Sequence, residues 1–247
     1  MKPEAEVSPP MLIGDDGEMK SNQDSVTYLN DYFAGIGEKL DEDLTLSGHP
    51  PKQFVFTEPV QRYPKIKVHL EEIRFMVEEI NVNKTSGIPS IRCDILKLAM
   101  QNLLPQLTWL YQLSFDEGIF PTSWKLARVH PIPKLGNERL VSNWRPISLL
   151  AVPSKIAERI MHYHLTNVLE KDEILIDQQY GYRQGRGTGD AIFKFVNDLY
   201  DNQDRSHVTA CCFVDLKKAF DSVCHLHLLE IVSKLGLHVS VMAWIQD

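Results

Sequence analysis

An apolar run that ends in a carboxylate constrains this sequence more than any other feature. Residues 208–214 read Val-Thr-Ala-Cys-Cys-Phe-Val, and Asp215 follows directly. A run of this length, rich in residues that favour strands, predicts a β-strand. A carboxylate at the end of such a strand has free oxygens, which are the ligands that Mg²⁺ prefers. An Asp in this place also serves as a turn former or cap, so the run alone leaves both roles open.

Charge is distributed unevenly along the chain. The formal net charge is -7, but residues 1–50 contain three lysines against eleven acidic residues, so the negative charge belongs to the N-terminal region. Residues 125–159 have the opposite balance, with seven Lys and Arg residues against two Glu residues. A cationic segment of this kind indicates either contacts with nucleic-acid phosphates or an ordinary solvated surface.

Apolar periodicity predicts a helix-rich chain. We expect helices at 25–40, at 68–80, from Cys93 onward with an interruption or bend at Pro105, at 154–170, at 190–201 and from Ser222 to Leu235. Residues 124–134 alternate like a strand, and Pro131 and Pro133 confine that strand to a sheet edge. Residues 1–22 are predicted to form a disordered tail, and residues 23–66 a helix followed by a proline-containing linker.

The cysteines and the apolar content limit the class of protein. Four cysteines, Cys93, Cys211, Cys212 and Cys224, lack any C-x-x-C spacing, which favours reduced thiols in an intracellular, nuclear or cytoplasmic protein over a zinc site. The N-terminus lacks the apolar core of a signal peptide, and no apolar run is long enough for a membrane span. We therefore expect no membrane partner.

Several blocks in a fixed order resemble one family. Residues 214–223, Val-Asp-Leu-Lys-Lys-Ala-Phe-Asp-Ser-Val, resemble motif A of the reverse transcriptases of non-LTR, LINE-type retrotransposons. The blocks upstream resemble the finger motifs of the same family: Asn83 to Gly87 with Ile91 to Leu98, Trp124 to Lys134, Asn143 to Leu149, Lys155 to Leu169, and Gln179 to Thr188. One departure is Ile88, which stands where the family usually has Asp. An ordered set of blocks is far more specific than one motif.

The resemblance implies an α+β, polymerase-like fold: helix-rich fingers at 67–207 and a partial palm with an incomplete antiparallel sheet at 208–247. It implies that Asp215 is catalytic and binds Mg²⁺, assisted by the carbonyl of Leu216. Phe220 would exclude a 2′-hydroxyl, although a core Phe at a helix start is the alternative. The implied partners are an RNA template, a DNA primer and a dNTP.

Four basic residues match positions of the family that contact phosphates. Lys134 and Arg145 match the finger residues that grip the triphosphate, where Lys offers a point charge and Arg a bidentate fork. Arg183 and Arg186 stand in a glycine-rich loop and match residues that hold template or primer phosphates; solvated loop charges are the alternative.

The second carboxylate motif of the family is not found in this sequence. Nucleotidyl transfer with two metal ions needs more than one carboxylate, and the family supplies the others from a Tyr/Phe-x-Asp-Asp hairpin, which these 247 residues lack. We therefore expect that the 247-residue chain does not polymerise DNA unaided. The alternative is a non-catalytic nucleic-acid-binding remnant. An aspartyl phosphotransferase fits poorly, because Lys217 stands where such sites often have a second Asp.

Overall fold

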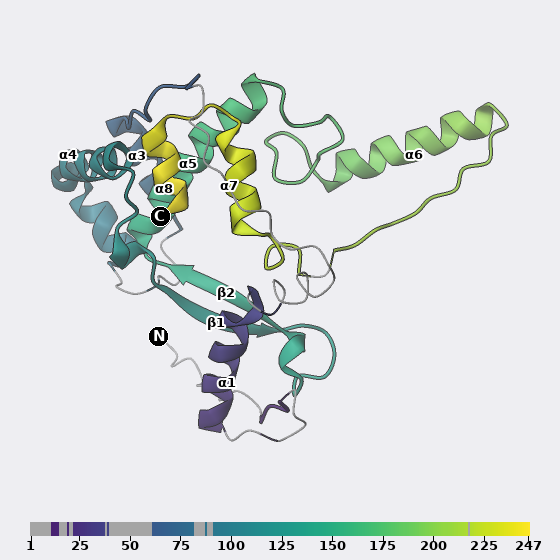
Figure 1. Ribbon diagram of the computed structural model, residues 1–247, viewed down its shortest axis with the longest axis horizontal. Helices are drawn as coiled ribbons and strands as arrows, with labels where there is room; N and C mark the ends of the chain where they lie inside the picture. The colour runs from purple at the N-terminus through teal and green to yellow at the C-terminus, as the bar shows by residue number, and fades with distance from the viewer. Residues whose placement is uncertain are drawn as a thin grey trace. The chain divides into compact units, whose positions relative to one another are not determined.

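The computed structural model describes residues 11–14, 19, 22–37, 39, 61–81, 87, 91–216 and 218–247 (Figure 1). The chain divides into two compact units. The first combines residues 1–161 with residues 219–247, and the second comprises residues 162–218. The described part of the chain is rich in helix and contains one two-stranded antiparallel sheet, so the prediction of an α+β fold is confirmed at that level.

The sheet of the first unit is a hairpin of β1 (Ala127–Pro133) and β2 (Trp144–Leu150). Its register pairs Ala127 with Leu150 and Pro133 with Trp144. Pro131 faces Pro146 across the ladder. Because proline cannot donate a ladder hydrogen bond, these residues suit strands with an open outer edge, and the predicted edge position of the first strand is confirmed.

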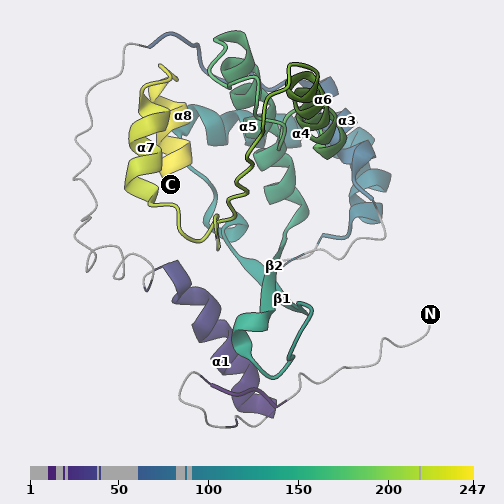
Figure 2. The same cartoon turned by 90° about the vertical axis from the view of Figure 1, so that its right-hand side faces the viewer.

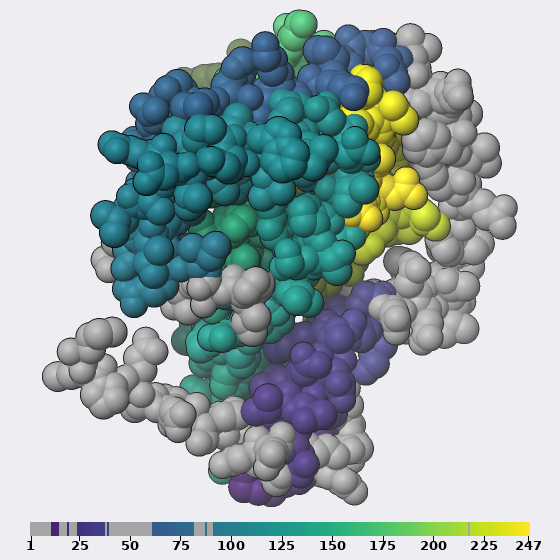
Figure 3. Space-filling view, turned by 90° about the vertical axis from the view of Figure 1, so that its left-hand side faces the viewer, coloured from purple at the N-terminus to yellow at the C-terminus, as the bar shows by residue number. Residues whose placement is uncertain are grey.

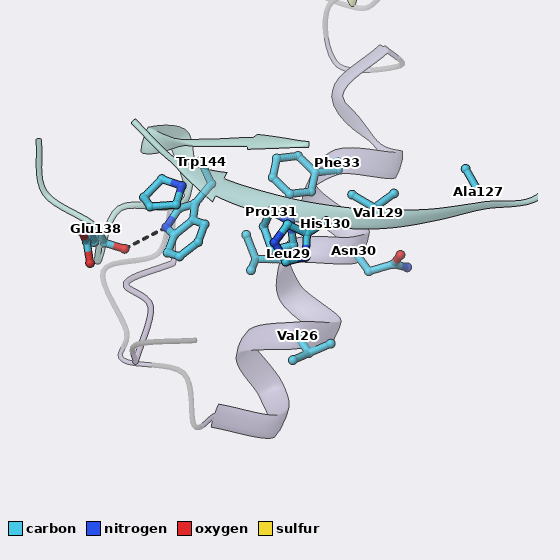
Figure 4. A pocket seen from close by; sticks show the side chains of 11 residues that line it. Val26, Leu29, Asn30, Phe33, Ala127, Val129, His130, Pro131, Glu138 and Trp144 are labelled. Atoms are coloured by element: carbon cyan, nitrogen blue, oxygen red, sulfur yellow. Dashed lines mark hydrogen bonds between the residues drawn. The ribbon is translucent and has the colours of Figure 1, made fainter. Parts of the chain in front are cut away.

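Helix α1 (Asn22–Ala34) lies along one side of this hairpin in both views (Figures 1 and 2). Leu12, Leu29, Val141 and Trp144 form a buried apolar cluster there. A cavity of about 670 Å³, lined mostly by apolar side chains of α1 and the hairpin, lies beside this cluster (Figure 4). The burial of Leu12 departs from the predicted disordered tail at 1–22, because Leu12 has an apolar cluster to enter.

Helices α3 (Leu70–Glu79), α4 (Cys93–Glu117) and α5 (Val152–Lys171) contribute most of the buried apolar side chains of the first unit. Ile73 and Val77 of α3 are fully buried, as are Ile156 and Ile160 of α5. These are the positions that the 3.6-residue period assigns to the core, so these helix predictions are confirmed. Helix α4 runs as one helix through Pro105.

Helices α7 (His225–Ser233) and α8 (Val239–Gln246) lie side by side in both views and end the first unit (Figures 1 and 2). Helix α8 packs on α4, and Figure 3 shows its yellow atoms against the teal surface of α4. Gly118 permits this close approach: its φ is 69°, and a Cβ there would lie 2.7 Å from the Cβ of Ala243. The helix predicted from Ser222 to Leu235 is shorter in the structure, where α7 covers only His225–Ser233. Helix α8 is a separate helix that the sequence did not predict.

The second unit contains α6 (Thr188–Asp204), a turn-rich segment before it and an extended segment after it. The strand predicted at 208–214 is not formed among the described residues: 207–216 are irregular and exposed, and Val208 is 99% exposed. A strand obtains its hydrogen bonds from a neighbour, and no described strand lies beside this segment. No helix in the described part of the chain is long and apolar enough to cross a membrane.

Candidate functional site

The two faces of the hairpin differ in chemistry. Directly opposed residues of an antiparallel ladder share a face, as do residues two apart on one strand. Ala127, Val129, Pro131 and Pro133 of β1 therefore share one face with Trp144, and most of them line the cavity beside α1. By the same alternation, Arg128, Ile132 and Lys134 of β1 share the other face with Arg145 and Ile147 of β2. His130 alternates with this set but also lines the cavity. The second face is largely exposed and mixes three cationic side chains with apolar ones.

Lys134 and Arg145 come close to each other through the register. Arg145 pairs with Ile132, and the backbone N–H of Lys134 donates to the carbonyl of Asn143 at 2.6 Å, which continues the ladder by one step. Lys134 and Arg145 are thus diagonal neighbours on one face, within reach of a single multiply charged group. The sequence prediction that named both residues is compatible with this placement, which by itself does not test binding.

The two side chains differ in how they are held. The ammonium Nζ of Lys134 donates to the carbonyl of Ser142 at 3.2 Å, and the side chain is half-buried. Arg145 is exposed, and among the described residues neither it nor Arg128 forms an ion pair with a carboxylate. A guanidinium with no internal partner retains its donors for an external anion.

Asp215 lies at the end of the exposed segment in the second unit. Within the residues that the structure describes, no group of three or more His, Cys, Asp or Glu side chains could hold a metal ion. Mg²⁺ takes six oxygen ligands, commonly one or two carboxylates together with water and phosphate oxygens. Asp215 and the carbonyl of Leu216 would supply two of them, and the described residues bring no cluster of further carboxylates to this point.

The residues that follow Asp215 are also exposed. Leu216 is 71% exposed, and Phe220, which belongs to the first unit, is 77% exposed in a turn before α7. Phe220 is therefore not buried among the described residues, and its role at the sugar of a nucleotide stays a prediction. Asp215 belongs to the second unit. Lys134, Arg145 and Phe220 belong to the first unit. Lys217 and residues 83–86 lie outside the described residues.

Arg183 is used inside the second unit. Its Nε donates to Oε1 of Glu170 at 2.9 Å, its Nη2 donates to Oε2 at 2.6 Å, and its Nη1 donates to the carbonyl of Ile176 at 2.8 Å. Only 7% of the Arg183 side chain is exposed. The hydrogen bonds from Arg183 lower the pKa of Glu170 below its ordinary value. This geometry fastens the segment after α5 to the end of that helix.

Arg186 makes a similar internal contact. Its Nη2 lies 3.0 Å from Oδ1 of Asp177, and its Nη1 donates to the backbone carbonyl of the same residue. Thirty-one per cent of its side chain is exposed. The proposal that these two arginines hold template or primer phosphates stays a prediction, but both already have anionic partners within the chain.

Sequence reasoning missed the residues that shape the loop between β1 and β2. The side-chain amide Nδ2 of Asn143 donates to the carbonyl of Asn137 at 2.9 Å. The indole Nε1 of Trp144 donates to the carbonyl of Glu138 at 2.8 Å (Figure 4). Both residues belong to the Asn143 to Leu149 block, whose resemblance to a finger motif marks the segment but does not reveal these contacts.

The described fold is a helix-rich α+β fold that exposes a cationic hairpin face. Residues 132–247 match the family described as reverse transcriptase (RNA-dependent DNA polymerase). The chain is 31% identical over 179 residues to a probable RNA-directed DNA polymerase from transposon BS of Drosophila melanogaster, covering 72% of this chain and 20% of that protein.

Two further relatives agree with that match. The RNA-directed DNA polymerase from mobile element jockey of Drosophila melanogaster is 28% identical over 188 residues, covering 74% of this chain and 20% of that protein. The Pol polyprotein from the type-1 retrotransposable element R2 of Popillia japonica is 32% identical over 128 residues, covering 51% of this chain and 17% of that protein. Together these matches support a reverse transcriptase domain of the non-LTR, LINE-type retrotransposons in this chain. It spans about a fifth of the length of the first two relatives.

Proposed function

We propose that the chain supplies the fingers and the first part of the palm of an RNA-directed DNA polymerase, and that the cationic face of its hairpin holds phosphate groups. One observation carries the second half of this proposal. Lys134 and Arg145 share one face of the β1–β2 hairpin, and Arg145 has no carboxylate partner among the described residues. The family supports the first half.

The chemistry of the two side chains suits a polyphosphate or a nucleic-acid backbone. A Lys ammonium acts as a point charge, and an Arg guanidinium donates two parallel hydrogen bonds to one phosphate. Their diagonal placement matches two neighbouring phosphates better than one isolated anion. The proposed ligands are therefore the triphosphate of a dNTP and the backbone of an RNA template with its DNA primer.

In this proposal Asp215 and the carbonyl of Leu216 contribute to an Mg²⁺ site, and Phe220 excludes the 2′-hydroxyl of the incoming nucleotide. Magnesium would supply charge neutralisation at the transferred phosphate. The other oxygen ligands would come from the triphosphate, from water and from carboxylates other than those of the described residues, since these hold no cluster that suffices. We place this activity inside the cell, in the nucleus or cytoplasm, where template RNA and dNTPs occur.

A second candidate is a nucleic-acid-binding module without catalysis. The observation that favours it is that the described residues combine a cationic surface with a single, exposed carboxylate at the predicted metal position. Both candidates predict binding by the hairpin face. They differ in whether the chain incorporates nucleotides.

The test measures the affinity of the purified 247-residue chain for an RNA template annealed to a DNA primer, by fluorescence anisotropy. Lys134→Ala and Arg145→Ala are expected to weaken binding, each by roughly threefold to tenfold, which corresponds to one net hydrogen bond of about 1 kcal/mol. Lys65→Ala is the matched control, because Lys65 is a half-exposed lysine of the same unit that already pairs with Asp116. Unchanged affinity in both hairpin variants would contradict the proposal.

A dNTP-incorporation assay on the same template separates the two candidates. The binding module predicts no incorporation by the 247-residue chain, with binding retained. Incorporation that is abolished by Asp215→Asn would favour the enzyme and would overturn the expectation that these residues do not polymerise unaided.

A further inference from the structure

The loop between β1 and β2 holds the cationic face in shape. Lys134 begins this loop and Asn143 ends it, and the two are joined by the backbone hydrogen bond from Lys134 N–H to the Asn143 carbonyl at 2.6 Å. Inside the loop, the Asn143 amide donates to the carbonyl of Asn137 at 2.9 Å. Asn143 therefore contacts both the start and the middle of the loop, one through its backbone and the other through its side chain.

The same loop determines where the ammonium of Lys134 lies. Its Nζ donates to the carbonyl of Ser142, the residue just before Asn143. The backbone N–H of Asn143 donates to the carbonyl of Leu140 at 2.9 Å, which makes residues 141–143 a short 3₁₀ turn and orients that Ser142 carbonyl. A lysine side chain is otherwise flexible and costs entropy to fix, so a fixed acceptor restricts it toward one region.

Gly136 lies close to the side chain of Asn143 inside the loop. Its φ is 130°, a conformation that L side chains rarely adopt, and a Cβ on Gly136 would lie 3.2 Å from the Asn143 Nδ2. The loop thus needs a glycine at 136 partly because the Asn143 amide occupies the adjoining space. On the opposite face of the hairpin, the Trp144 indole fastens Glu138 in the same loop (Figure 4).

We propose that Asn143 is a positioning residue for a two-cation phosphate site formed by Lys134 and Arg145. Asn143 does not touch the ligand. Its amide fixes the loop, the loop carbonyl at Ser142 holds the Lys134 ammonium on the face that carries Arg145, and the two cations are preorganised for a polyphosphate. This inference rests on the proposed function, because it explains how the hairpin face of that proposal is kept ready.

The test uses the purified 247-residue chain and inorganic triphosphate, with affinities from isothermal titration calorimetry at low salt. Asn143→Ala is expected to weaken triphosphate binding about as much as Lys134→Ala, roughly threefold to tenfold. Because both changes act through the Lys134 ammonium, one by deleting it and the other by releasing it, the double variant Lys134→Ala/Asn143→Ala should bind no more weakly than Lys134→Ala alone. Asn143→Gln, which keeps the amide donor, should recover part of the loss. Wild-type affinity in Asn143→Ala, or additive losses in the double variant, would overturn the inference.

Gly136→Ala places a Cβ against the Asn143 amide and so perturbs the contact between Asn143 and the loop without changing Asn143. It is a second variant for the case in which Asn143→Ala fails to fold. It should weaken triphosphate binding in the wild-type background but not in Lys134→Ala, while thermal unfolding shows a folded chain in both. A loss of equal size in the Lys134→Ala background would assign Gly136 and Asn143 to general stability and would overturn the inference. If Lys134→Ala and Arg145→Ala both bind triphosphate like the wild type, the proposed function fails by itself, whatever Asn143 does.

Discussion

Arg183 and Glu170 form a bidentate ion pair in which Nε to Oε1 measures 2.9 Å and Nη2 to Oε2 measures 2.6 Å. The pair joins the last turn of α5 to the loop before α6, across thirteen residues of sequence. A third hydrogen bond from Arg183 reaches the Ile176 carbonyl within the intervening segment. The segment before α6 is thus organised around one guanidinium.

Arg183→Ala should loosen residues 172–187 while leaving the first unit folded. Removal of the guanidinium leaves Glu170 and the Ile176 carbonyl without their partner, and the segment contributes few buried side chains to compensate. Limited proteolysis with chymotrypsin, followed by mass spectrometry, should show faster cleavage after Tyr180 and Tyr182 in this segment. Arg205→Ala is the matched control, since Arg205 is an exposed arginine of the same unit whose side chain has no ion pair in the described structure. Equal cleavage in wild type and Arg183→Ala would contradict this role.

Acid should release the same segment. The pKa of Glu170 is lowered in the folded chain, chiefly by the hydrogen bonds from Arg183, relative to an unfolded value near its ordinary one. A lowered folded pKa means that the stabilisation is fully present above the ordinary Glu value of about 4.3 and is lost as the pH falls through the folded value. Hydrogen exchange of 172–187, corrected for intrinsic rates, should rise below about pH 4. Glu170→Gln should show the faster exchange already at pH 7, and the absence of any difference between pH 6 and pH 3 would refute the linkage.

Trp244 anchors α8 to the first unit. Its indole Nε1 donates to Oγ of Ser114 at 3.0 Å, and its ring lies 5.1 Å from Phe115 and 5.0 Å from Phe120, centroid to centroid. Trp244→Ala should lower the free energy of unfolding of this unit by about 3 kcal/mol, the cost of deleting a buried aromatic side chain. Trp109→Ala is the control, because Trp109 is 65% exposed on α4 and should change stability little. Urea unfolding followed by circular dichroism checks both, and equal losses would remove the assigned anchor role.

Residues 208–216 should exchange their amide hydrogens rapidly. No backbone hydrogen bond between described residues involves this segment outside regular elements, and no described strand pairs with it. Its apolar side chains are open to solvent, with Phe213 at 83% and Val214 at 81% exposure. Exchange should therefore be near the intrinsic rate here and slow in α4, whose core side chains are buried. Strong protection throughout 208–214 would show that a strand forms.

The sequence predicted those elements whose own residues show an apolar period or a restricting proline. Helices α3 and α5 show a buried apolar stripe at helical spacing, and prolines 131 and 133 restrict β1 to an edge. Helix α8 was missed because its eight residues are apolar on several sides, with Val241, Met242 and Trp244 all buried, so no periodic pattern separates a core face. Its close approach to the end of α4 requires Gly118, the residue that follows α4 and lies more than a hundred residues earlier in the chain.

In the candidate site, the sequence predicted some residues but not their contacts. Lys134 and Arg145 could be named because each stands in a recognisable block, and Asp215 because it ends an apolar run. The strand at 208–214 was expected from composition, but a strand also needs a partner, which composition does not reveal. The partners of Arg183 and Asn143 are set by loop geometry, because one pair spans thirteen residues and the other six. The contacts of Arg183 and Asn143 are therefore known only from the folded structure.

The dependence of nucleic-acid binding on salt tests the central claim most directly. Each phosphate neutralised on a single strand contributes about -0.7 to the slope of log K against log salt concentration. The account predicts that Lys134→Ala/Arg145→Ala makes this slope for single-stranded RNA less steep by about 1.4, whereas Lys65→Ala leaves it as in the wild type. A wild-type slope in the double variant would show that the hairpin face does not contact phosphates and would contradict the account.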